Sequence, residues 1–355
     1  IITPIVCFII LPLGFLTGFA SLLLDLKALP LSWLLDTATG FTLHLTELFS
    51  NIPYANFHVP NPSFLMIMLY YLSCLLLRRN RVRWRYIPLI LVVSFYLLNP
   101  LLSKESFRVT FLDVGQGDSS VVELPDGKVM IIDAGPVSPD SGRMVVAPYL
   151  WSKGIRKIDY LVISHPHPDH YGGIDYVLNN FETGEVWTSG SGSDVIAGLI
   201  DNAEDTKIIV KTLKRGQLLE GDCYKIYVLH PYDGFYAGSP RGTFSDENSG
   251  ALVLKVESED GSVLFTGDIE EEAENDIAHL RAWLKSDIIK VPHHGGRTSS
   301  SNALLNAVRP ELAVASVGRN NSFHHPHEET VKRYTGSGAR FMRTDESGAV
   351  TIRFA

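Results

Sequence analysis

Residues 164–173 constrain the fold of this chain more than any other part of its sequence. They read Ser-His-Pro-His-Pro-Asp-His-Tyr-Gly-Gly, and they follow the apolar residues 160–163, which predict a buried strand. Four possible metal ligands therefore lie within six residues at the end of a strand, namely His165, His167, Asp169 and His170. Imidazole nitrogens and carboxylate oxygens are ligands that divalent first-row metal ions accept.

The spacing within this segment predicts how its side chains are divided between two sites. Alternate side chains of an extended segment share a side, so we expect His165, His167 and Asp169 to converge while His170 points elsewhere. The two intervening prolines restrict the backbone and would hold the ligands in place. This geometry favours two adjacent metal ions, one held by imidazoles and the other by a carboxylate plus an imidazole. A histidine-rich surface turn is the alternative.

Four other predicted strands are also followed by histidine or aspartate residues. His230 follows residues 225–229, Asp268 follows 263–265, His293 and His294 follow 288–291, and residues 324–327 (His-His-Pro-His) follow 313–317. Taken singly, His230 could be an edge histidine, and Asp268 could cap the N-terminus of a helix. However, nine of the ten histidines after residue 102 lie at these strand ends. Together they predict a metal site built from several loops, because a strand end is rigid enough to position a ligand.

The first 102 residues have a different character. Residues 1–24 are almost wholly apolar, carry no charge, and are long enough to span a bilayer. Residues 31–49 show apolar residues at helical spacing, which predicts an amphipathic helix lying in the interface or lining a pore. Residues 64–77 and 87–102 are shorter apolar runs. We expect them to be further membrane helices, with buried core helices as the alternative.

Five arginines within residues 78–85 separate these two shorter runs. By the positive-inside rule this segment is cytoplasmic. The next run would then return the chain across a multi-pass plasma membrane protein, so everything after Leu102 is expected on the outer face.

The charge of the chain is divided unevenly. Its net charge is −8, but residues 1–102 hold six Lys and Arg against three Asp and Glu, and the remainder holds 25 against 36, a net −11. An acidic domain argues against broad nonspecific nucleic-acid binding. It leaves a nucleic-acid enzyme open, because bound divalent ions reverse the local field. The three cysteines, Cys7, Cys74 and Cys223, have neither disulfide nor zinc-finger spacing.

Domain organisation follows from these patterns. Residues 1–102 are predicted to be transmembrane and amphipathic helices, residues 103–106 a polar linker, and residues 107–355 a domain in which many short strands are interspersed with helices. Such a pattern predicts a layered α/β sandwich. Because the chain begins with Ile1 inside an apolar run, we expect it to be part of something longer.

Four segments carry a resemblance to a known family: Phe-Leu-Asp-Val-Gly-Gln-Gly-Asp-Ser at 111–119, the histidine-rich residues 165–173, Phe-Thr-Gly-Asp at 265–268, and Val-Pro-His-His-Gly at 291–295. They resemble the metallo-β-lactamase superfamily, whose fold is an αββα sandwich. With the preceding apolar helices, the chain is similar to the C-terminal half of the ComEC family, the bacterial competence channels for DNA uptake.

This resemblance implies a ligand set for two divalent ions, Mn²⁺ or Zn²⁺. His165, His167 and His230 would hold one ion, Asp169 and His170 the second, and Asp268 would bridge them. His325 fits the spacing of the last ligand in the superfamily's RNA-processing nucleases, where an additional histidine assists the leaving group, a role open to His294 or His293. Which of these three is the last ligand stays open. Asp113 and Asp118 are expected to order the loops rather than to bind metal.

The resemblance also implies an activity. The chain would be a hydrolase, a membrane-tethered di-metal phosphodiesterase and deoxyribonuclease that degrades one strand of incoming DNA while the other enters the channel. Asp169 would orient the attacking hydroxide. The implied partners are single- or double-stranded DNA, membrane lipid, and the other parts of the channel and of the competence machinery. The alternatives are a metal-dependent hydrolase of another ester, such as a phosphocholine or a lactone, and a non-catalytic DNA-translocation scaffold.

Overall fold

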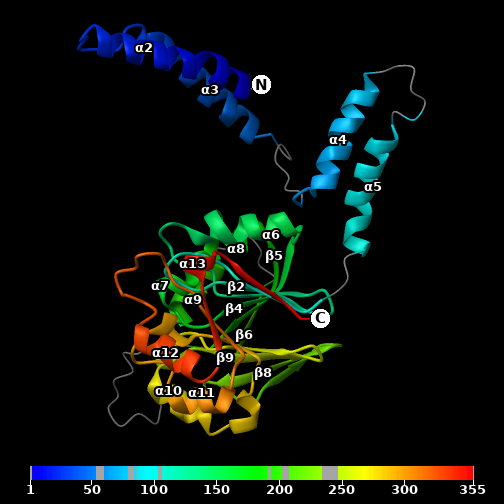
Figure 1. Cartoon of the computed structure of the whole chain (residues 1–355), viewed down its shortest axis with the longest axis vertical. Coiled ribbons are helices and arrows are strands. Elements are labelled where there is room, and N and C mark those ends of the chain that lie inside the picture. Colours follow the sequence, from blue (N-terminus) through cyan, green and yellow to red (C-terminus); the bar gives the residue numbers. More distant parts are fainter. Residues whose placement is uncertain are drawn as a thin grey trace. The chain divides into compact units, whose positions relative to one another are not determined.

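The computed structural model describes residues 2–52, 60–78, 84, 86–102, 106–190, 193–201, 208–233 and 247–354, with only the backbone described for 97–102 and 193. By its internal contacts the chain divides into two compact units, Ile1–Val59 and Pro60–Ala355 (Figure 1). A hydrogen bond from the amide of Asn61 to the carbonyl of Ser152 (3.1 Å) joins the start of the second unit to the rest of that unit. The predicted domain boundary at 103–106 stays a prediction, since residues 103–105 lie outside the described part.

The first unit contains the one described helical run that is both long and apolar enough to cross a membrane. Helices α1 (Ile2–Ile5), η1 (Val6–Ile10) and α2 (Leu11–Leu23) are continuous over Ile2–Leu23, with a mean hydropathy of 2.3. α3 (Ser32–Ser50) follows, as predicted. Large apolar side chains on this run, such as Phe8 and Leu22, are each 80% exposed. An apolar surface of this extent is typical of a segment that contacts lipid or another protein.

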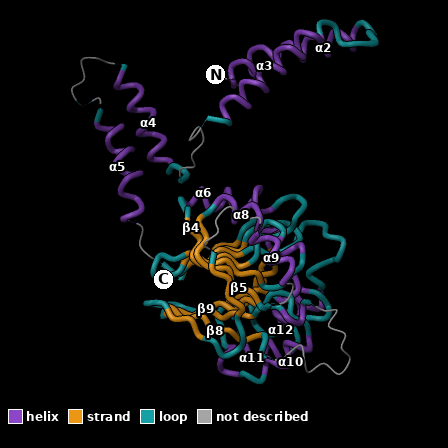
Figure 2. Tube along the Cα trace, turned by 180° about the vertical axis from the view of Figure 1, so that it is seen from behind, coloured by secondary structure: helices purple, strands orange, loops and turns teal. Residues whose placement is uncertain are grey.

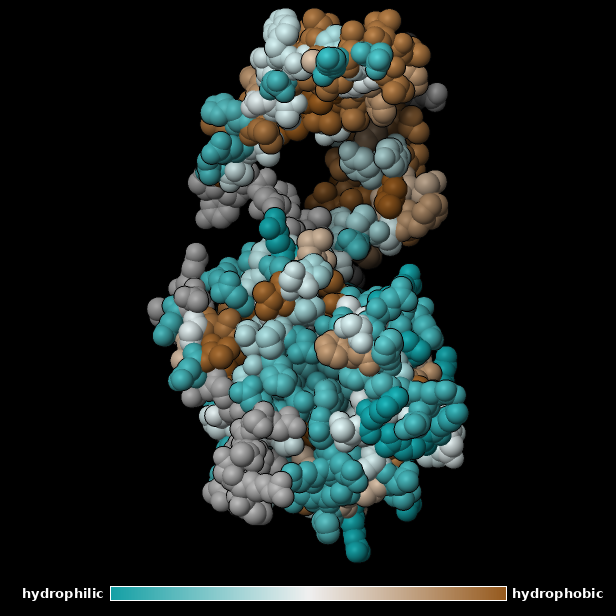
Figure 3. Space-filling model, turned by 90° about the vertical axis from the view of Figure 1, so that its left-hand side faces the viewer, coloured by the Kyte–Doolittle hydropathy of each residue, from teal (hydrophilic) through white to brown (hydrophobic). Residues whose placement is uncertain are grey.

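Two more apolar helices begin the second unit. α4 (Phe64–Leu77) and α5 (Ile87–Leu102) have the predicted bounds, and the Ser63 hydroxyl caps α4 by accepting a hydrogen bond from the amide of Met66 (3.4 Å). Figure 3 shows hydrophobic side chains gathered on the helices that precede the β-sheet domain, whereas the face of that domain in view is mostly hydrophilic. Most of the arginine-rich segment lies outside the described residues, so the orientation across the membrane stays a prediction.

The rest of the second unit is a sandwich of two seven-stranded sheets. The first sheet has the order β14 (Val350–Arg353), β1 (Arg108–Phe111), β2 (Ser120–Glu123), β3 (Val129–Ile132), β4 (Lys157–Ile163), β5 (Glu182–Thr188), β6 (Ile209–Thr212). The second has the order β13 (Arg340–Arg343), β12 (Leu312–Ala315), β11 (Ile288–Lys290), β10 (Ser262–Phe265), β9 (Val253–Ser258), β8 (Tyr224–His230), β7 (Leu218–Glu220). Helices cover the outer face of each sheet (Figures 1 and 2).

Alternation along the strands explains the four layers. In β3, Met130 and Ile132 face the core between the sheets, while Val129 and Ile131 face the helices α6 (Ala147–Lys153), α8 (Ile174–Asn180) and α9 (Ser193–Asp201). The second sheet packs in the same way against α10 (Glu271–Ala278), α11 (Asn302–Val308) and α12 (Glu328–Gly336). A strand buried on both faces reads as a continuous apolar run, which is the pattern seen in the sequence. The predicted αββα sandwich is confirmed.

The topology also brings the candidate ligands to one edge. β3, β4, β5 and β6 run parallel to one another, as do β10, β11, β12 and β13. Parallel strands end at the same edge of their sheet. The loops that follow β3 and β4 therefore lie at one edge of the first sheet, and the loops that follow β10, β11 and β12 lie at one edge of the second. One alternative from the sequence is wrong: Asp268 does not cap α10, whose N-cap residue is Glu270.

Candidate metal centre

The histidine-rich segment is extended only as far as His167. There the backbone (φ −94°, ψ 143°) leads into the short helix α7 (Pro168–Tyr171), and proline suits the first position of a helix because its φ is already helical. The prediction that His170 points away from its neighbours is therefore wrong. Its ring centroid lies 4.0 Å from that of His165, and its Nε2 lies 3.9 Å from Asp169 Oδ2.

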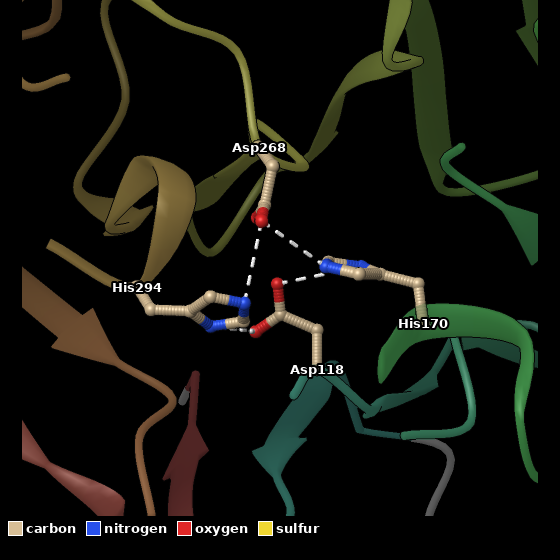
Figure 4. A group of neighbouring side chains, drawn as sticks. All are labelled: Asp118, His170, Asp268 and His294. Carbon is tan, nitrogen blue, oxygen red and sulfur yellow. Dashed lines mark ion pairs between the residues drawn. The ribbon is translucent and has the colours of Figure 1, made fainter. Parts of the chain in front are cut away.

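Four buried side chains direct possible ligand atoms at one another: Asp118, His170, Asp268 and His294, all within 4.8 Å (Figure 4). Asp118 precedes β2, His170 lies on α7, Asp268 follows β10, and His294 lies on η6 (Pro292–Gly295) after β11. The group thus draws on loops of both sheets.

Asp268 and Asp169 connect the two imidazoles of this group. Asp268 Oδ2 lies 3.3 Å from the Nε2 atoms of both His170 and His294. Asp169 Oδ2 lies 3.3 Å from His294 Nε2. Two carboxylates and two imidazoles therefore present a mixed oxygen and nitrogen donor set, which suits zinc or manganese.

The far nitrogens of both histidines are held by protein groups. Asp133, directly after β3, places Oδ2 2.8 Å from His170 Nδ1 and accepts hydrogen bonds from the amide and hydroxyl of Ser164 (2.8 and 2.6 Å). His294 Nδ1 donates to the carbonyl of Ser316 (2.8 Å). Such contacts fix the tautomer that leaves Nε2 as the ligand atom. Sequence reasoning missed Asp133, although an aspartate directly after an apolar strand was a usable signal.

Lys290 is a second residue that the sequence analysis did not single out. It is 3% exposed, its Nζ donates to the carbonyl of Gly267 (2.9 Å), and it forms ion pairs with Asp268 Oδ1 (3.2 Å) and with Asp118. The signal for it was a lysine inside the apolar residues 288–291, because lysine is almost never fully buried unless it is paired.

His165 and His167 lie side by side, with ring centroids 4.6 Å apart. His165 is buried, its Nε2 has no hydrogen-bond partner among the described residues, and burial lowers its pKa well below the usual range. A neutral imidazole with a free nitrogen is in the state that binds metal. His167 is partly exposed, and its Nε2 lies 3.3 Å from a carboxylate oxygen of Glu247.

The structure does not bring His230 into the four-residue group, in contrast to its predicted place among the ligands. His230 Nε2 donates to the carbonyl of Ser249 (2.7 Å), and Nδ1 lies 3.5 Å from an Arg215 nitrogen and 3.9 Å from Asp276. Burial lowers its pKa to about 4. Both ring nitrogens thus have protein neighbours, as in a histidine that serves the fold.

Of the three candidates for the last ligand, the structure brings His294 into the group. The His293 and His294 backbones are left-handed (φ 46° and 53°), a strained conformation that turns consecutive side chains apart. His293 Nδ1 instead lies 2.9 Å from Glu270 Oε1. The His325 ring centroid lies 6.2 Å from that of His294 and 5.7 Å from that of His293, and burial lowers the pKa of His325 to about 4.

The centre holds an excess of buried negative charge. Although burial opposes charge on both histidines, Asp268 raises the pKa of His170 well above its usual range and that of His294 to about 10. The buried carboxylates of Asp118, Asp133 and Asp268, with the partly exposed Asp169, are balanced by Lys290 and by protons on the two imidazoles. Buried charge of one sign is costly without compensation. Divalent cations fit this centre because they can take the place of those protons, and the free nitrogen of His165 adds a further donor.

Comparison with known proteins identifies the fold family. Residues 112–223 and 224–319 match the family model of the Metallo-beta-lactamase superfamily. The chain belongs to the metallo-β-lactamase superfamily. Residues 1–84 match a second family model, Competence protein. A Competence protein segment followed by a metallo-β-lactamase domain confirms the predicted resemblance to the ComEC family.

The chain is also similar, over most of its length, to two named proteins. The chain is 29% identical over 286 residues to ComE operon protein 3 of Bacillus subtilis (74% of this chain, 35% of that protein). It is 32% identical over 243 residues to Competence protein ComA of Neisseria gonorrhoeae (68% and 31%). The chain thus spans about a third of these relatives. The crystal structure of the metallo-beta-lactamase fold protein YhfI from Bacillus subtilis aligns with a TM-score of 0.44 at 9% identity, covering 70% of this chain and 99% of that one.

Proposed function

We propose that this chain is a membrane-tethered, metal-dependent nuclease that degrades one strand of incoming DNA during DNA uptake. The observation that carries the proposal is the convergence of Asp169, His170, Asp268 and His294 in a chain that also holds a Competence protein segment. A metallo-β-lactamase domain with these donors supports a metal-dependent hydrolase. The similarity to competence proteins supports DNA as the substrate of the proposal.

The centre would hold two divalent ions, Mn²⁺ or Zn²⁺. Asp169, His170, Asp268 and His294 would hold one of them, and His165 with His167 would hold the other, with Asp268 shared. Such ions lower the pKa of bound water and stabilise the charge that develops on a phosphate during in-line displacement. His230 is left out of this ligand set because Ser249 occupies its Nε2.

The protein groups around the centre have separate tasks in this proposal. Asp169, on the first turn of α7, orients the attacking water, and it is the less buried of the two carboxylates, with a side chain 35% exposed. Asp268 is buried and fixes the two imidazoles relative to each other. Because His294 serves as a ligand, protonation of the leaving oxygen passes to His293, which contacts Glu270, or to the neighbouring His325.

The proposed location is the outer face of the plasma membrane. The apolar run Ile2–Leu23 supports a membrane anchor. The five arginines in residues 78–85 support a cytoplasmic position for that loop by the positive-inside rule. The domain would then meet DNA before it enters the channel, beside the other parts of that channel.

The test uses the full chain in detergent with linear single- and double-stranded DNA, in Mn²⁺, Zn²⁺ or chelator. We expect metal-dependent cleavage that is lost in Asp169→Ala and Asp268→Ala. Glu272→Ala, an exposed carboxylate on α10, is the control and should cleave normally. Metal binding without cleavage of DNA would favour a hydrolase of another ester, assayed with chromogenic phosphodiesters and lactones. Neither binding nor cleavage would favour a translocation scaffold.

A further inference from the structure

Lys290 is the one charged residue on β11, whose other residues, Ile288 and Ile289, are buried apolar side chains. Its ammonium lies at the strand end, against the carbonyl of Gly267 and the carboxylates of Asp118 and Asp268. A lysine so deeply buried keeps its charge only if carboxylates compensate it. Lys290 is therefore a fixed positive charge inside the group of candidate ligands.

The two oxygens of Asp268 contact different partners, and the Lys290 ammonium is one of them. Oδ1 lies 3.2 Å from Lys290 Nζ, whereas Oδ2 lies 3.3 Å from each of the Nε2 atoms of His170 and His294. A carboxylate can bridge two metal ions through both oxygens or through one. With Oδ1 engaged by Lys290, only Oδ2 faces the imidazoles.

Lys290 engages Asp118 as well. Asp118 is buried and belongs to the same four-residue group, so by type it could serve as a metal ligand. Its Oδ2, however, forms the ion pair with Lys290, and its two oxygens lie 3.7 and 3.8 Å from the Nδ1 atoms of His170 and His294 rather than beside their Nε2 atoms. The same ammonium thus holds one oxygen of the shared carboxylate and the carboxylate of an additional possible ligand.

The imidazole pair is the weaker half of the centre on independent grounds. His165 and His167 supply two nitrogens, and the third histidine that the sequence predicted for them, His230, donates to the carbonyl of Ser249 instead. The other half has Asp169, His170 and His294 in addition to the shared Asp268. An ion at the imidazole pair therefore depends on whatever charge Asp268 and Asp118 can offer it.

We propose that Lys290 is a built-in cation that competes with metal: it keeps Asp118 out of the ligand set and makes the centre bind its two divalent ions unequally, the ion at His165 and His167 weakly. This rests on the metal centre of the proposed function. The physical reason is repulsion, because an ion on Asp268 lies a few ångströms from an ammonium that contacts the same carboxylate.

The decisive variant is Lys290→Met, which keeps the length and apolar stem of the side chain and removes the charge. Metal binding to the full chain in detergent is measured by isothermal titration with Mn²⁺ and by metal content after dialysis, without DNA. Wild type should bind one ion tightly and a second weakly. Lys290→Met should bind the second ion at least about tenfold more tightly, since one charge acting on a divalent ion about 5 Å away has an effect of that order even at the dielectric constant of water.

The control is Lys255→Met, which removes another largely buried lysine, paired with Glu257 on β9, and should leave metal binding unchanged. A purely structural role for Lys290 predicts the opposite sign, namely weaker binding on its removal. Weaker or unchanged binding of the second ion in folded Lys290→Met would overturn the proposal.

A second variant decides the matter if Lys290→Met does not fold. Asp118→Asn removes a carboxylate that is not a ligand in this proposal and leaves the Lys290 charge less compensated. Both ions should then bind about tenfold more weakly, and wild-type affinity in Asp118→Asn would refute the competition. Because DNA is absent from these measurements, the expected metal pattern in a chain that cleaves no DNA would uphold the inference while the proposed nuclease function fails.

Discussion

His230 provides a test that separates a metal ligand from a histidine that serves the fold. The side chain is fully buried, and its Nε2 donates to the carbonyl of Ser249. Burial lowers its pKa to about 4, against 6.5 for the ordinary side chain. His230→Gln retains a side-chain amide that can donate to Ser249 but removes the titrating ring.

The sign and size of the effect follow from proton linkage. With a pKa of about 4 in the folded state and 6.5 in the unfolded state, the unfolded chain binds more protons in the window between those values, so the free energy of unfolding falls as the pH drops through it. The loss from this one group amounts to about 2 kcal/mol at pH 5 and about 3 kcal/mol at pH 4. His230→Gln has no titrating ring at this position, so its free energy of unfolding should fall less with acid by those amounts.

The assay is guanidinium unfolding of the full chain in detergent, followed by tryptophan fluorescence between pH 7.5 and 5, with chelator present. The comparison is the pH slope of wild type against that of His230→Gln, because all other titrating groups are common to both. A slope equal to that of wild type would refute the assignment of His230 as a buried neutral group. Loss of metal binding in His230→Gln would show instead that His230 is a ligand, as its sequence position suggested.

Three further predictions concern the fold and the support of the centre. Asp133→Asn removes the charge that holds His170 Nδ1 and should weaken Mn²⁺ binding about 10- to 100-fold in a titration; unchanged affinity would contradict a supporting role. Trp187→Ala opens a cavity in the core between the sheets and should cost about 3–5 kcal/mol in guanidinium unfolding, whereas a loss below 1 kcal/mol would mean that the core collapses around the site. Ser301→Ala removes the hydroxyl that accepts from the amide of Leu304 and caps α11; we expect a loss of about 1 kcal/mol in the same assay, and no change would show that the cap is dispensable.

The sequence predicted the layers and most strands because their residues are buried on both faces and read as apolar runs. It missed β13, where arginines flank Phe341 and Met342 at the edge of a sheet, because an edge strand needs no continuous apolar run. It also missed the helical turn at Pro168, since an extended reading of residues 164–170 ignored the preference of proline for the start of a helix.

The site was predicted by residue type and only partly by position. Spacing along the chain could not choose between His294 and His325, because the choice depends on the left-handed backbone at His293 and His294, which no local pattern announces. Asp133 and Lys290 escaped notice for a different reason. Neither belongs to a histidine cluster, and their importance comes from contacts with residues far along the chain.

The candidate ligands come from both sheets, with Asp169 and His170 on the loop after β4 and Asp268 and His294 on the loops after β10 and β11. An ion held by all four would join two layers whose shared core is built of apolar contacts such as Phe111 against Phe265. The free energy of metal binding would then also stabilise the contact between the two sheets. Loosening the core far from any ligand should lower metal affinity, and a bound ion should make the two sheets open together rather than one at a time.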